Sequence, residues 1–142
     1  MKKLFFVFFL VANIIQAQDI EPKNVIENFF NGFHKKDTLA LRATTHKDIV
    51  MQSVAKTKEG NKVTTESFSN FLKSIKSLPE NLVFEERILD YKVQTDGLLA
   101  HVWTPYEFYV NGNLSHKGTN SFTLVKEKEQ WVIIHIIDTR MR

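Results

Sequence analysis

The side chains best suited to acid–base chemistry or ligand binding lie in the C-terminal half of the chain. An Asn-Gly pair at 111–112 separates two stretches in which polar and apolar residues alternate. Such a pair is the strongest short signal for a two-residue hairpin turn, since both of its residues adopt positive φ readily. A turn of this length places Glu107 opposite His116 and Trp103 opposite Asn120. Directly opposed residues share one face of a sheet, so these four side chains are predicted to lie together.

Glu107 and His116 are the candidates for a catalytic pair. A neighbouring carboxylate favours the protonated form of an imidazole, which could then act as an acid or as a hydrogen-bond donor. An exposed ion pair between two strands has the same signature in a sequence. Both interpretations of the pair therefore stay open at the level of the sequence.

The same face of the predicted sheet is expected to form the wall of a pocket. Apolar walls with a few convergent polar groups are typical of ligand-binding cavities. The predicted ligand-binding residues are Trp103, Glu107, Tyr109, His116, Asn120 and His135. His135 has isoleucines on both sides, a setting that is also typical of a structural histidine in a core. A one-residue bulge would move parts of this set to the opposite face.

Metal and cofactor chemistry is not expected. The histidines and carboxylates have none of the spacings typical of metal ligands, and no glycine-rich phosphate loop is present. The chain also has no cysteine, which excludes disulfides and thiol catalysis. We therefore predict no metal site and no cofactor.

The elements that carry these residues follow from the periodicity of the apolar side chains. A period near 3.6 in the first half predicts helices, and a period of two from Leu82 onward predicts strands. The expected elements are helices at 22–36 and 37–43, a strand at 49–55, a helix from Thr65 to Pro79, and strands at 82–93, 98–110, 114–126 and 131–140. Helices followed by an antiparallel meander indicate an α+β domain with the helices on one face of a curved sheet.

Residues 1–18 have the features of a secretory signal peptide. Lys2 and Lys3 precede an apolar run that ends near the small residue Ala17. The run is too short to span a membrane, which takes about 20 apolar residues. We expect cleavage after Ala17 or Gln18, which would leave 19–142 as one domain. The product is expected to be periplasmic or secreted, with no stable membrane anchor.

The charge of the chain argues against a nucleic-acid partner. The full chain of 142 residues carries a formal net charge of +3, and loss of the two lysines in 1–18 leaves +1. Neither value provides the one-signed field that recruits DNA, RNA or an anionic membrane. The expected partner is a small apolar or aromatic ligand.

Several stretches of the second half resemble one known branch of proteins. The stretches Val102–Tyr109, Ser121–Val125, Trp131–Ile133 and Asp138–Arg140 are similar to small exported bacterial members of the nuclear-transport-factor-2-like superfamily, whose fold ketosteroid isomerases share. These members are often classified as lumazine-binding or as being of unknown function. The resemblance implies a cone-shaped α+β fold, in which N-terminal helices pack on a strongly curved antiparallel sheet and enclose a pocket.

Ketosteroid isomerase activity is not expected despite this resemblance. The isomerases use an acidic base, an acidic hydrogen-bond donor and a tyrosine. Here the corresponding stretch Ile49–Ala55 has no carboxylate, the first helix has no tyrosine, and Phe122 occupies the later inward position. The superfamily includes enzymes and non-enzymatic binding modules, so activity does not follow from the fold. The sequence thus favours a protein without enzymatic activity.

The function that the sequence favours is an exported small-molecule-binding protein with a cone-shaped pocket. The alternatives are a hydrolase or dehydratase that uses Glu107 and His116 as an acid–base pair, and a non-catalytic dimeric scaffold. The second sheet face is predicted to be too apolar for water and to form a homodimer, as is common in the family. Its predicted residues are Val102, Thr104, Tyr106, Phe108, Thr119, Ser121, Thr123, Ile134, Ile136 and Asp138.

Overall fold

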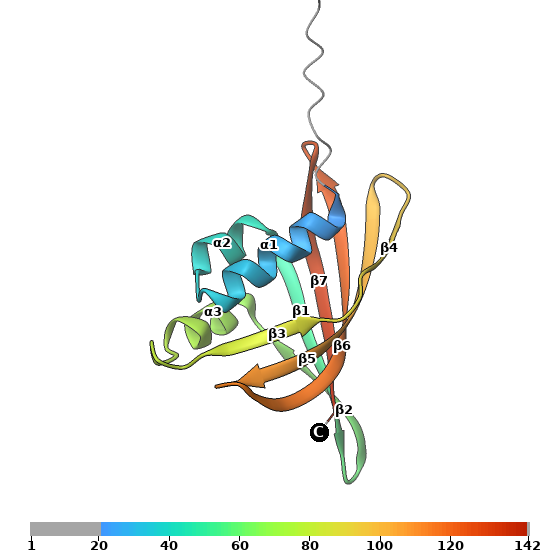
Figure 1. The fold of residues 1–142 in the computed structure, drawn as a ribbon. Coiled ribbons are helices and arrows are strands. Elements are labelled where there is room, and N and C mark those ends of the chain that lie inside the picture. The colour runs from blue at the N-terminus through green and yellow to red at the C-terminus, as the bar shows by residue number, and fades with distance from the viewer. Residues whose placement is uncertain (1–20, 142) are drawn as a thin grey trace, which may run out of the picture.

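Three helices lie on one side of a single curved sheet in the computed structural model, which describes residues 21–141 (Figure 1). The elements in chain order are α1 (Pro22–His34), α2 (Thr38–Ala43), β1 (Thr45–Thr57), β2 (Gly60–Glu66), α3 (Phe68–Lys76), β3 (Phe84–Ile88), β4 (Lys92–Thr95), β5 (Leu99–Val110), β6 (Asn113–Glu127) and β7 (Gln130–Arg140). The predicted signal peptide, 1–18, falls outside the described residues.

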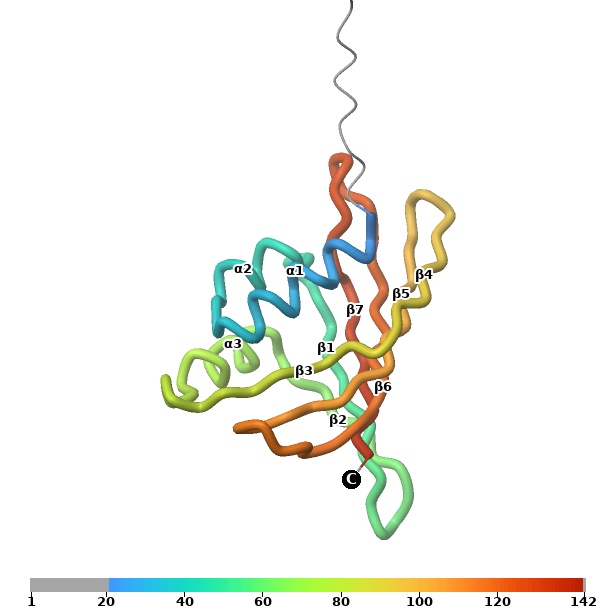
Figure 2. Tube along the Cα trace, viewed as in Figure 1, coloured from blue at the N-terminus to red at the C-terminus, as the bar shows by residue number. Residues whose placement is uncertain are grey.

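The sheet has the strand order β2-β1-β7-β6-β5-β3, and β4 also pairs with β5. Neighbouring strands are antiparallel except for β1 and β7, which run parallel. In Figures 1 and 2, β3 and the adjoining ends of β5 and β6 curve beneath the helices toward α3. The predicted α+β class is confirmed, and the one parallel pair makes the sheet mixed.

Helix α1 forms because its apolar residues recur on one side. Val25, Ile26, Phe29 and Phe30 are all buried against the sheet, as expected for an amphipathic helix. Pro22 occupies the first turn, where its missing N–H costs no hydrogen bond. This stripe of α1 supplies much of the core.

The segment between β1 and α3 differs from the prediction. A helix was expected from Thr65, but β2 extends to Glu66 and pairs with β1. Helix α3 instead begins after Ser67, whose Oγ accepts a hydrogen bond from the Asn70 N–H at 3.3 Å. A serine at this position satisfies one of the N–H groups that a helix start leaves unpaired.

The predicted strand 82–93 is divided into β3 and β4. The break lies opposite Pro105 of β5, because β3 pairs as far as Tyr106 and β4 begins at Trp103. Proline has no N–H to donate to a neighbouring strand, so a regular ladder cannot pass it on both sides. The carbonyl of Pro105 accepts a hydrogen bond from Leu89 at 2.9 Å within the break.

Two β-bulges change the predicted register. Tyr109 lies opposite Leu114 and Leu124 lies opposite Ile133, as predicted. The pairing shifts by one residue between Tyr109 and Phe108 and again between Leu124 and Thr123, so Phe108 lies opposite His116 and Thr123 lies opposite His135. The shifts leave Ser115 of β6 and Ile134 of β7 without a partner in the ladder.

The shifted register reverses the faces of two strand segments. Glu107 pairs with Lys117 and not with His116, and Trp103 pairs with Ser121 and not with Asn120. The predicted opposition of these residues is therefore wrong, because a one-residue shift moves every later side chain to the other face.

The predicted composition of the outer face changes for the same reason. Val102, Tyr106, Phe122 and Ile136 are buried on the inner side, which the helices cover. Val102, Tyr106 and Ile136 were predicted for the outer face. Ser121 and Thr123 lie on the outer face as predicted, and His101, Trp103, His135 and Ile137, which were predicted for the inner face, join them there.

Candidate functional site

A cavity of about 320 Å³ lies between α1, α3 and the inner face of the sheet. This volume is at the small end of the range for ligand-binding pockets. The lining residues are Phe29, Phe30, Phe33, Met51, Gln52, Ser53, Ala55, Thr64, Glu66, Phe71, Glu86, Asn120, Phe122, Ile136, Asp138 and Arg140. They range from buried Phe122 to exposed Glu66 and Arg140, so the cavity reaches from the core to the surface.

Phenylalanines form the apolar wall of the cavity. Phe122 packs edge-on against Phe29 and Phe30, with ring centroids 6.1 and 5.8 Å apart. Phe33 stacks on Phe71 at 6.0 Å and so joins α1 to α3. Edge-to-face pairs add stability beyond the area they bury and hold the rings in defined orientations. The wall of the cavity is therefore aromatic, with its rings in contact with one another.

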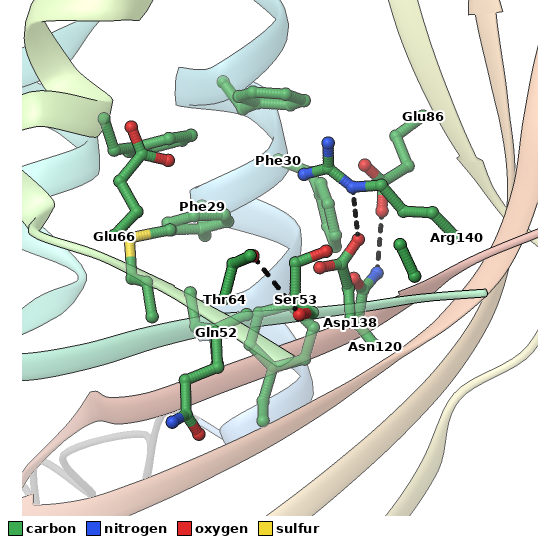
Figure 3. A pocket seen from close by; sticks show the side chains of 16 residues that line it. Phe29, Phe30, Gln52, Ser53, Thr64, Glu66, Glu86, Asn120, Asp138 and Arg140 are labelled. Carbon is green, nitrogen blue, oxygen red and sulfur yellow. Dashed lines mark hydrogen bonds and ion pairs between the residues drawn. The ribbon is translucent and has the colours of Figure 1, made fainter. Parts of the chain in front are cut away.

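Four polar side chains, those of Glu86, Asn120, Asp138 and Arg140, gather at one end of the cavity (Figure 3). Asn120 is 5% exposed, and its Nδ2 donates hydrogen bonds to Glu86 Oε1 at 2.7 Å and to Thr104 Oγ1 at 3.2 Å. These bonds connect β3, β5 and β6 across the floor of the cavity. Asn120 thus fixes the position of the Glu86 carboxyl group.

Asp138 belongs to a second set of hydrogen bonds at this end. Its Oδ2 accepts from Arg140 Nε at 3.0 Å and from the Tyr106 hydroxyl at 3.2 Å. The same hydroxyl donates to the Thr139 carbonyl at 2.9 Å. Burial, followed by the charge of Asp138, raises the pKa of Tyr106, so the hydroxyl keeps its proton. The Asp138 carboxylate and the Arg140 guanidinium form an ion pair beside Glu86.

Glu86 is the titratable group of the cavity. Burial raises its pKa to about 7, the hydrogen bond from Asn120 opposes that rise, and the charge of Asp138 adds to it. Both the protonated and the ionised forms are therefore populated near neutral pH. Such a carboxyl group can donate or accept a hydrogen bond or transfer a proton.

His34 holds the backbone of Glu86 in place. Its Nε2 accepts a hydrogen bond from the Glu86 N–H at 2.9 Å, which requires the neutral imidazole. Burial lowers the pKa of His34, against the opposing effect of Glu85, and thus favours that neutral form. This hydrogen bond connects α1 to β3 at Glu86, whose carboxyl group lines the cavity.

The predicted ligand-binding residues are divided between two faces. Asn120 lies in the cavity wall. Trp103 is 43% exposed on the outer face, and His135 on that face has its Nε2 3.1 Å from Gln52 Oε1. The structure does not bring Trp103 or His135 to the cavity, because the two bulges turn their segments outward.

Glu107 and His116 do not form the predicted pair. Glu107 bonds to Lys117 Nζ at 2.6 Å and to the Tyr109 hydroxyl at 2.9 Å on the outer side. The bond from Lys117 lowers the pKa of Glu107. His116 instead stacks on Phe108, with centroids 4.9 Å apart. None of the three residues Glu107, Tyr109 and His116 lines the cavity.

Sequence reasoning missed the acidic end of the cavity. Glu86 is one of three consecutive charged residues in β3, so alternation alone gives no inward direction. Asp138 and Arg140 are two residues apart and share a face, but the prediction placed that face outside because it did not include the bulge in β7. The shared face of this acid–base couple is the signal that could have identified the site.

Two further findings concern residues 21–141 only. No group of three histidine, aspartate or glutamate side chains in this part of the chain could hold a metal ion. No helix within it is long and apolar enough to cross a membrane.

Comparison with known proteins gives similarity in structure alone. No family model and no curated protein matches the chain. A nuclear-transport-factor-2-like protein of unknown function from Shewanella baltica is 16% identical, with a TM-score of 0.61 over 84% of this chain and 90% of its own. A candidate dehydratase of that family from Streptomyces avermitilis is 13% identical, with a TM-score of 0.62 over 83% and 91%.

A candidate ketosteroid isomerase from Parabacteroides distasonis is 15% identical, with a TM-score of 0.60 over 86% of this chain and 89% of its own. Identities this low establish a shared fold and leave activity open. The order of elements, the curved sheet and these solved structures agree with the resemblance found in the sequence. The chain therefore has the nuclear-transport-factor-2-like fold.

Proposed function

We propose that this protein binds a small, largely apolar molecule in the cavity between α1 and the sheet. The observation that carries the proposal is a cavity with a phenylalanine wall and one buried polar end, where Glu86 and Asn120 converge. The wall would hold the body of the ligand, and the polar end would fix its orientation.

The test compares two variants of neighbouring residues in β1. Ser53 lines the cavity, whereas Val54 does not, since successive side chains of a strand point to opposite faces. We expect Ser53→Phe to fill the cavity and to abolish binding of 2-phenylethanol, measured by NMR titration. Val54→Phe should bind with the wild-type affinity, on the order of 1 mM for so small a probe. Equal binding by Ser53→Phe and the wild type would refute the proposal.

Dehydration is a second candidate, favoured by the ionisation of Glu86 near neutral pH. In a β-hydroxyketone, Asp138 would take the proton next to the carbonyl group while Glu86 protonates the departing hydroxyl. A carbon–carbon double bond and water would result. The probe 4-hydroxy-4-phenyl-2-butanone would show the enone by its ultraviolet absorption. A rate equal to that of buffer, or an unchanged rate in Glu86→Gln, would exclude this candidate.

We also propose that the protein is exported after loss of 1–18 and forms a homodimer through the outer sheet face. The exposed Trp103 and the half-buried Ile137 on that face support a partner. Sedimentation equilibrium at micromolar concentration should give twice the monomer mass, and Ile137→Asp should give the monomer. N-terminal sequencing of exported material should begin at Gln18 or Asp19. A monomeric wild type would contradict the proposed homodimer. An intact Met1 in exported material would contradict the proposed cleavage.

A further inference from the structure

The charges that line the cavity do not balance. Its charged residues are Glu66, Glu86, Asp138 and Arg140. Arg140 pairs with Asp138 at 3.0 Å, so these two charges offset each other. Within residues 21–141, no basic side chain forms an ion pair with Glu66 or Glu86. The cavity is therefore electronegative.

The carboxyl group of Glu86 is also only half satisfied. Oε1 accepts the hydrogen bond from Asn120, whereas no donor within the described part of the chain bonds to Oε2. The side chain is half-buried and lines the cavity, so Oε2 is available to a bound molecule. The charge of Arg140 reaches Glu86 but is shared with Asp138. A carboxylate withdrawn from water without an ion pair of its own carries a desolvation cost, which a cationic partner would offset.

The apolar wall suits a cation as well. Phe29, Phe30 and Phe122 present aromatic rings to the cavity, and in the view of Figure 3 Phe29 and Phe30 stand between Glu66 and Glu86. The face of an aromatic ring carries partial negative charge and attracts ammonium groups. A carboxylate and aromatic faces together recognise a positively charged nitrogen on an apolar body.

We propose that the ligand is a protonated organic amine, whose ammonium group pairs with Glu86 and whose apolar body lies against Phe29, Phe30 and Phe122. The inference rests on the proposed function, because it names the chemical class of the molecule that the cavity holds. An uncharged ketone or alcohol would use Glu86 differently, as a protonated hydrogen-bond donor.

The two classes of ligand predict opposite effects of pH. An ammonium group binds the ionised form of Glu86, so binding displaces a proton and strengthens as the pH rises. For a Glu86 pKa of about 7, affinity for an amine should rise about 30-fold between pH 5.5 and 8. A ligand that accepts a hydrogen bond from protonated Glu86 should lose affinity over the same range.

Other titratable and charged groups surround Glu86 and need a control. They are Asp138 and Arg140 from β7, Tyr106 from β5 and His34 from α1, with Glu66 elsewhere in the cavity lining. Glu86→Gln removes only the carboxyl group and keeps an oxygen for the Asn120 bond. Glu85→Gln makes the same change at the preceding, exposed residue, which does not line the cavity.

The experiment titrates the purified protein with 2-phenylethylamine, 2-phenylethanol and 3-phenylpropionate by calorimetry at pH 5.5 and pH 8. We expect the amine to bind at least 10-fold more tightly than the other two compounds at pH 8. Its affinity should also be about 30-fold higher at pH 8 than at pH 5.5. Glu86→Gln should lose that preference and the pH dependence, whereas Glu85→Gln should retain both.

Two kinds of failure are distinguishable. Tighter binding of 2-phenylethanol or 3-phenylpropionate, or a pH-independent affinity for the amine in the wild type, would overturn the amine proposal and leave the proposed function in place. Binding of none of the three probes, or equal binding by Ser53→Phe, would overturn both.

Discussion

Replacing Glu86 by glutamine should stabilise the protein at alkaline pH. The pKa of this carboxyl group is about 7 in the folded protein against an ordinary value of 4.5. Below pH 4.5 the group is protonated in both states, so it does not affect the free energy of unfolding. Between pH 4.5 and about 7 the unfolded state ionises first, and stability falls as the pH rises. Glutamine carries no charge, so the variant avoids this loss.

The size of the effect follows from the difference between the two pKa values. One pKa unit corresponds to about 1.4 kcal/mol, so full ionisation of Glu86 costs the folded state about 3 kcal/mol. Roughly 2.5 kcal/mol of this loss should occur between pH 5 and pH 8. The side chain is partly buried in the cavity lining, so solvent screening sets this figure as an upper value.

Urea unfolding of the wild type and of Glu86→Gln at pH 5, 6, 7 and 8 measures the difference directly. His34 and every other titratable group are present in both proteins, so their contributions to the pH dependence cancel in the comparison. Glu85→Gln is the matched control: it should show no growing gain in stability from pH 5 to pH 8, and its only expected departure from the wild-type curve is a small one through the titration of His34. A gap between the wild type and Glu86→Gln that stays constant from pH 5 to pH 8 would refute the reasoning about burial.

Three other substitutions test the architecture around the cavity. Gly118→Ala should lower the free energy of unfolding by more than about 2 kcal/mol, because the added Cβ would overlap the Thr139 carbonyl and crowd the Tyr106 hydroxyl; wild-type stability in urea would contradict this. Asp37→Ala should cost about 1 kcal/mol, since the carboxylate accepts two N–H bonds at the start of α2, and an unchanged urea midpoint would speak against that role. Trp103→Ala should leave the binding of 2-phenylethanol within about twofold of the wild type, because its side chain lies on the outer face; loss of binding in NMR titrations would return the site to that face.

The long elements were predictable because their periodicity is strong. The apolar stripe of α1 and the alternation in β5, β6 and β7 each extend over ten or more residues. Strand β2 was missed because all seven of its residues are exposed, so no buried apolar side chains mark an alternation. The division of β3 from β4 depends on Pro105, which lies in a different strand.

The candidate site was less predictable because it depends on two bulges. Ser115 and Ile134 occupy the unpaired positions, and neither is a glycine or carries another local mark of a bulge. Each bulge moves the side chains of one strand segment to the opposite face of the sheet. As a result Thr104 and Ile136 lie on the inner face, where Trp103 and His135 were predicted. Asn120 of β6 lies between the two bulges and faces inward, in the direction that the sequence predicted.

A crystal structure of the protein with 2-phenylethylamine at pH 8 would test the binding cavity most directly. The account predicts the phenyl ring against Phe29, Phe30 and Phe122, with the ammonium nitrogen within about 3 Å of a carboxyl oxygen of Glu86. An amine bound on the outer face beside Trp103 and His135, with the cavity unoccupied, would contradict it.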